Sequence, residues 1–107
     1  MTIEQQFATV AEDLVGSSAT VDRGRILHAP GLRTAGRFFA FATTSDLVVK
    51  LPAGRVGELV GSGAGRPCEI RRGTPMREWV QLSPTSPREC AIYVIEARDF
   101  VASQQRR

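Results

Sequence analysis

The chain has 107 residues, of which 42% are hydrophobic and 23% charged, and its formal net charge is +3. This length suits a single domain over residues 1–107, and the composition excludes a disordered chain. No apolar run approaches the roughly 20 residues of a membrane span. The first residues carry acidic side chains and no Lys or Arg, which argues against a signal peptide, so we expect a cytoplasmic protein without membrane contact.

The first part of the chain has the pattern of a helix followed by strands. Apolar residues at helical spacing predict a helix over residues 3–15, and Thr2 with Gln5 fits a capping box at its start. A first strand is expected over residues 19–28. The turn chemistry of residues 29–36, which contain Pro and Gly, predicts a loop before the next strand.

Two further strands are expected in a hairpin, over residues 37–43 and 47–51. The alternation of a strand places Phe39 and Phe41 on one face and Phe38 on the other. Because the other aromatic residues that we assign lie on expected buried faces, Phe38 is the aromatic side chain that this pattern leaves available to a partner.

The second half of the chain predicts a helix, two strands and a final helix. Pro52 begins the first helix, residues 67–71 and 77–82 form strands, and residues 87–103 form the last helix. The order α-β-β-β-α-β-β-α predicts an α+β fold with a single antiparallel sheet and helices packed on it. The last helix has an apolar stripe long enough to require either packing on the sheet or a dimer contact. The stripe consists of Cys90, Tyr93, Val94, Ala97, Phe100 and Val101.

Few residues are candidates for chemistry. His28 is the one histidine, and Cys68 and Cys90 lack zinc-ligand spacing, which favours buried, unpaired thiols. The glycine-rich segment 61–65 follows a helix and lacks the spacing of a phosphate loop. We expect no catalytic, cofactor-binding or metal-binding residue and no enzyme. An enzyme would need a tight pocket around His28, Cys68 or Glu78.

The basic excess of the chain lies in one segment. Residues 66–77 contain four arginines and one glutamate, a net charge of +3 that equals the excess of the whole chain. Guanidinium groups bind anionic or planar partners, so this segment and Phe38 are the candidate partner-binding residues. Four arginines neutralise about three or four phosphates, which predicts weak, salt-dependent nucleic-acid binding. We therefore expect a protein partner first and nucleic acid as the alternative. The arginines are Arg66, Arg71, Arg72 and Arg77.

Three stretches resemble the N-terminal domain of TfoX, the competence regulator, and its stand-alone relatives. Residues 30–33 with 36–40 resemble the first hairpin of that family, and residues 47–56 resemble the strand and helix that follow. Residues 73–79 resemble a Gly-x-Pro-Met-Lys-Glu-Trp signature, with Arg77 at the position of the lysine. We expect this signature to form a turn and to bring its apolar side chains into the core. Its structural positions are Gly73, Pro75, Met76, Glu78 and Trp79.

The resemblance implies an α+β fold similar to secretion-chaperone-like domains, and it implies no established enzyme activity. The chain has no counterpart of the C-terminal domain of the full-length regulator, so we expect a stand-alone relative. We therefore predict a small cytoplasmic binding or regulatory module, without a cofactor, that acts through protein contacts. A homodimer is compatible with this prediction, and a weak nucleic-acid-binding or competence-associated protein is the alternative.

Overall fold

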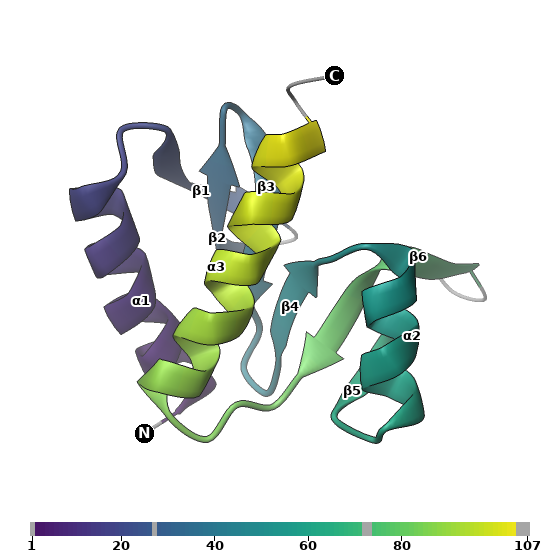
Figure 1. Cartoon of the computed structure of the whole chain (residues 1–107). Coiled ribbons are helices and arrows are strands. Elements are labelled where there is room, and N and C mark those ends of the chain that lie inside the picture. The colour runs from purple at the N-terminus through teal and green to yellow at the C-terminus, as the bar shows by residue number, and fades with distance from the viewer. Residues whose placement is uncertain (1, 27, 72–73, 105–107) are drawn as a thin grey trace.

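One antiparallel sheet carries three helices in the part of the chain that the computed structural model describes, namely residues 2–26, 28–71 and 74–104, without the side chains of 69–71 and 74–76 (Figure 1). Its six strands run in the order β1-β2-β3-β4-β6-β5. The α+β fold with a single antiparallel sheet is thereby confirmed. The elements are α1 (Ile3–Ser17), β1 (Val21–Ile26), β2 (Ala29–Thr34), β3 (Arg37–Ala42), β4 (Leu47–Lys50), α2 (Ala53–Gly61), β5 (Gly65–Arg71), β6 (Thr74–Leu82) and α3 (Pro87–Gln104).

Helix α1 begins at the expected capping box. The Thr2 hydroxyl accepts a hydrogen bond from the Gln5 N–H at 3.1 Å, and the Gln5 Oε1 accepts one from the Thr2 N–H at 2.8 Å. Two backbone N–H groups that the first turn leaves without helical partners are thus satisfied. The apolar stripe of α1, which includes Phe7 and Leu14, is buried against the sheet and α3.

Residues 29–34 form strand β2, where the sequence predicted a loop. Every residue of β2 pairs with β1, whereas the pairing with β3 begins only at Gly31, opposite Phe41. Pro30 therefore lies where its missing N–H costs no bond to β3. The turn from β2 to β3 consists of Ala35 and Gly36, whose φ angles of 50° and 83° are those of a tight hairpin turn. The expected turn is thus present in segment 29–36, but it occupies only the last two residues of that segment.

A β-bulge in β3 overturns the expected alternation of its phenylalanines. Ala40 pairs with Leu32 and Phe38 pairs with Arg33, so Phe39 is an extra residue in β3. An extra residue shifts the phase of a strand by one, and side chains beyond it point to the opposite face from the one that strict alternation predicts. Phe39 accordingly belongs to the core under the helices, and Phe41 lies on the other face of the sheet with Phe38 packed beside it.

The sheet thus has an apolar cluster on each face. The larger one lies under the helices and is completed by side chains from α1, α2 and α3. The smaller one lies on the opposite face and contains Trp79, which is only 8% exposed, as expected. The Trp79 and Phe41 rings are tilted by 52° with centroids 5.8 Å apart, a favourable aromatic geometry. The side chain of Met76 lies outside the described residues. The smaller cluster consists of Ala29, Phe41, Val48, Cys68 and Trp79.

Helix α3 covers the sheet, which was one of the two roles expected for its apolar stripe. Its buried residues Cys90, Val94, Ala97 and Val101 pack into the larger cluster, and Tyr93 and Phe100 are half-buried at the margin of that cluster. Arg55 of α2 donates to Glu96 of α3 at 3.0 Å, an ion pair that links the two helices. In Figure 1, α3 lies in front of the sheet, with α1 on one side and α2 on the other.

We predict that Trp79→Ala lowers the free energy of unfolding by about 3–5 kcal/mol, because it removes the largest ring of the smaller cluster. Trp79→Phe is the control, since it keeps an aromatic partner for Phe41, and it should cost clearly less. Urea denaturation followed by circular dichroism measures both values. An unchanged midpoint for Trp79→Ala would contradict the assigned role of the smaller cluster.

Candidate functional site

The expected basic segment forms the hairpin of β5 and β6. Its two described arginine side chains, Arg66 and Arg77, are both exposed. The side chains of Arg71 and Arg72 lie outside the described residues, as do Gly73 and the side chains of Pro75 and Met76 in the expected structural signature. The grouping of the four arginines into one patch therefore stays a prediction.

Arg66 has a partner inside the protein, the carboxylate of Asp46. Asp46 precedes β4 and is only 6% exposed, and its Oδ1 accepts a hydrogen bond from the Arg66 guanidinium. Its Oδ2 accepts from Gln81 Nε2 at 3.1 Å and from Ser45 Oγ at 3.1 Å. A buried carboxylate is costly unless it is paired and hydrogen-bonded, and these contacts supply both. Arg66 thereby fastens edge strand β5 to the turn before β4.

Phe38 is half-buried, whereas the sequence pattern left it exposed. Its ring lies against the backbone of Gly24 and Gly31, where a Cβ atom at either position would come within 3.0 Å of the ring. The guanidinium carbon of Arg33 lies 5.7 Å from the ring centroid, and Arg33 also donates to Asp22 at 2.7 Å. One face of the ring is therefore occupied by the two glycines. A contact of Phe38 with a partner stays a prediction.

The nucleophile and base candidates lie apart. His28 is exposed in the turn between β1 and β2, with a φ of 66°. Cys68 lies in the smaller cluster and Cys90 in the larger one, so the sheet separates the two free thiols. Burial raises the pKa of the Cys90 thiol to about 11. Burial, and then the Asp46 charge, raises the pKa of the Cys68 thiol. Both thiols are therefore protonated at neutral pH and are weak nucleophiles.

Glu78 is half-buried in β6, next to Trp79. Its backbone carbonyl accepts a hydrogen bond from the Leu51 N–H at 2.9 Å, which continues the pairing of β6 with the end of β4. The structural role expected of the Glu78 side chain in the signature stays a prediction.

A pocket of about 110 Å³ lies between α1 and the hairpin of β1 and β2. Phe7 and Pro30 form part of its apolar wall, and Glu4 and Arg23 are its charged lining residues. His28, Cys68 and Glu78, around which an enzyme would need a pocket, do not line this one.

The outer face of α3 carries two exposed isoleucines that the sequence analysis did not single out. Ile92 is 59% exposed and Ile95 is 38% exposed, and they are the large hydrophobic side chains exposed in the described part of the chain. They lie three residues apart and hence on the same side of the helix. The sequence already contains this pair of apolar residues at helical spacing, on the side of the helix opposite the stripe that contains Val94 and Ala97.

Two further classes of feature are absent from the described residues. They contain no group of three or more His, Cys, Asp and Glu side chains placed to hold a metal ion. None of the helices in the described ranges combines the length and apolar character needed to cross a bilayer.

No model of a known protein family, no curated protein and no solved structure matches this chain.

We predict that Asp46→Ala lowers the free energy of unfolding by about 1–3 kcal/mol, because it leaves Gln81 and Arg66 without their acceptor. Asp22→Ala is the matched control, since it removes an Asp–Arg pair in which the Asp22 side chain is 58% exposed. An exposed pair contributes about 0–1 kcal/mol, so the control should change little. Equal losses in the two variants, measured by urea denaturation, would contradict the structural role of Asp46.

The raised pKa of Cys90 predicts a loss of stability at alkaline pH. An unfolded thiol ionises near its ordinary pKa of 9.0, whereas the folded Cys90 thiol keeps its proton up to about pH 11. The unfolded state therefore binds fewer protons in this range, and the contribution of Cys90 to stability decreases as pH rises through it. Cys90→Ala should lose about 2–3 kcal/mol less than the wild type between about pH 8 and pH 11. Parallel stability curves of the two proteins against pH would contradict this.

Proposed function

We propose that this chain is a small, non-catalytic binding module of the TfoX N-terminal domain type, which acts in the cytoplasm through protein contacts made by the outer face of α3. The observation that carries the proposal is the exposure of Ile92 and Ile95 on one side of that helix. Single exposed apolar side chains are ordinary on a protein surface. Two neighbouring isoleucines on the outer side of a helix whose inner stripe is already buried leave apolar area in water, which favours a role in binding.

The environment of the candidate catalytic groups supports a binding role. His28 lies in a hairpin turn, and the two thiols are buried on opposite faces of the sheet with their pKa values raised. A nucleophile and a base within hydrogen-bond reach of each other are the usual mark of covalent catalysis. The described positions of these side chains do not supply that pair. Two free thiols also agree with a location in the cytoplasm.

The contacts of the basic segment favour a protein partner over nucleic acid, which stays the alternative. Arg66 is engaged by the Asp46 carboxylate, so its charge is balanced within the fold. Phe38 has one face on two glycines and an arginine beside its ring, which reduces the aromatic surface on which a base could stack. Binding to nucleic acid would then depend on Arg77 together with Arg71 and Arg72.

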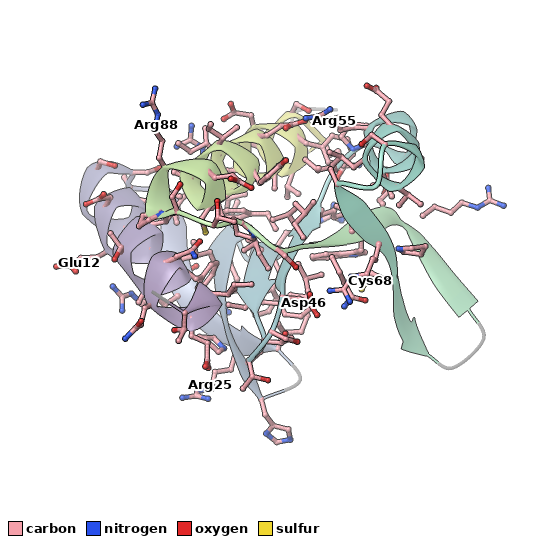
Figure 2. All side chains as sticks on the ribbon, turned by 90° about the horizontal axis from the view of Figure 1, so that it is seen from below. Glu12, Arg25, Asp46, Arg55, Cys68 and Arg88 are labelled. Atoms are coloured by element: carbon pink, nitrogen blue, oxygen red, sulfur yellow. The ribbon has the colours of Figure 1, made fainter. Side chains whose placement is uncertain are left out.

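A photo-crosslinking amino acid placed at Ile92 tests the proposed surface in cells of the source organism. We expect polypeptide adducts from position 92 and none above background from the same amino acid at Glu12, an exposed residue of α1 on a different surface (Figure 2). Absence of polypeptide adducts from position 92 would overturn the proposed surface.

A second measurement addresses the alternative. Fluorescence anisotropy against single- and double-stranded oligonucleotides at about 150 mM salt should show no sub-micromolar binding. Sub-micromolar binding that is lost in the variant Arg71→Ala with Arg72→Ala would replace our proposal with nucleic-acid binding through the basic segment.

A further inference from the structure

The outer face of α3 carries a stripe of four residues, with two isoleucines at its centre and two opposite charges at equal distances from that centre. Arg88, Ile92, Ile95 and Asp99 follow one another at spacings of four, three and four residues. At about 100° per residue they lie within about 60° of the helix circumference. Arg88 and Ile92 are exposed, Ile95 is 38% exposed and the Asp99 side chain is 65% exposed. An arginine thus marks the N-terminal end of the stripe and an aspartate the C-terminal end, with the isoleucines between them.

We propose that this stripe is a homodimer interface in which α3 packs antiparallel against α3 of a second copy of the chain. This proposal deepens the proposed function and rests on it, because it names the partner of the same surface. A two-fold axis that runs between the two helices, level with the midpoint between Ile92 and Ile95, brings each stripe residue opposite the one that lies equally far from this midpoint. Ile92 then faces Ile95 of the second copy, and Arg88 faces Asp99.

The charge pattern favours a second copy over an unrelated protein. A two-fold interface must be complementary to itself, so that residue i meets residue j and residue j meets residue i. The antiparallel stripe meets this condition at both of its ends. A parallel dimer would instead set Arg88 against Arg88 and Asp99 against Asp99, which are repulsive pairs. The spacing of four, three and four is also that of the seam between two packed helices.

The side chains at the ends of the stripe have bonding capacity for these contacts. Arg88 makes no ion pair with any other described residue, and Figure 2 shows it projecting from α3 away from the sheet. Arg98 donates to Asp99 through Nε at 3.1 Å and Nη2 at 2.9 Å, and both bonds use Oδ1. The second carboxylate oxygen of Asp99 is thereby left for an arginine of the second copy.

The fold permits the approach of a second helix. Helix α3 lies in front of the sheet, on the face that the helices cover, and its outer face therefore points away from the sheet (Figure 1). The apolar part of the stripe consists of two isoleucines, which corresponds to the small end of the range of protein interfaces. We therefore expect a weak dimer whose population depends on protein concentration, with the ion pairs at its ends setting the antiparallel orientation.

Charge reversal with rescue tests the orientation. Analytical ultracentrifugation of the full chain, at concentrations from about 10 μM to about 1 mM, measures the dissociation constant of the dimer. Arg88→Asp and Asp99→Arg should each weaken the dimer about tenfold, and the double variant should recover to within about threefold of the wild type. Ile92→Glu should weaken it by more than either. Glu12→Arg, a charge reversal on α1, is the control and should change nothing. Circular dichroism melting shows that each variant is folded.

Two results would overturn the inference. One is a wild-type protein that stays monomeric over the whole concentration range. The other is a dimer that the double variant does not rescue, which would assign the contact to another orientation or surface. The crosslinking at position 92 separates these failures from failure of the proposed function. Adducts to other polypeptides from a monomeric protein would leave the binding surface standing and remove only the second copy as its occupant.

Discussion

The bulge at Phe39 is the constraint on which both faces of this sheet depend. With strict alternation, Phe39 and Phe41 would share a face, and one side of the sheet would hold too many rings while the other held too few. The extra residue in β3 sends Phe39 into the core under the helices and leaves Phe41 to contact Trp79 on the opposite face. A central strand thus supplies a large side chain to each of two clusters, and neither face is left as a purely polar surface.

The smaller cluster lies on the face of the sheet without helices, and a set of polar side-chain contacts stabilises the strands that carry it. Asp46 holds Arg66 and Gln81, so the edge strand β5 is attached to the turn before β4 by side chains as well as by backbone bonds. Pro67 lies on the same edge strand, the kind of strand in which a residue without an N–H is tolerated. The sequence analysis counted Arg66 among the residues available to a partner, and the structure shows that it also stabilises the fold through Asp46.

Helix α3 has to satisfy two different surfaces. Its inner stripe of small and medium side chains, such as Val94 and Ala97, permits close packing on the sheet and on α1. Its outer stripe repeats the same spacing half a turn away, with charges at both ends and isoleucines at the centre. The first stripe accounts for folding. The second carries the exposed Ile92 and leaves one carboxylate oxygen of Asp99 beyond the bonds from Arg98, and a second copy of the helix is the partner that we propose from its charge order.

The sequence by itself determined the features that depend on neighbouring residues. The capping box of Thr2 and Gln5, the helices, the antiparallel α+β class and the burial of Trp79 follow from local pattern and side-chain chemistry. The strand at residues 29–34, the direction of Phe39 and the pairing of Asp46 with Arg66 were decided only by the tertiary structure. Each depends on strand register, which joins residues distant in the chain, and a shift of one residue reverses the face of every side chain beyond it.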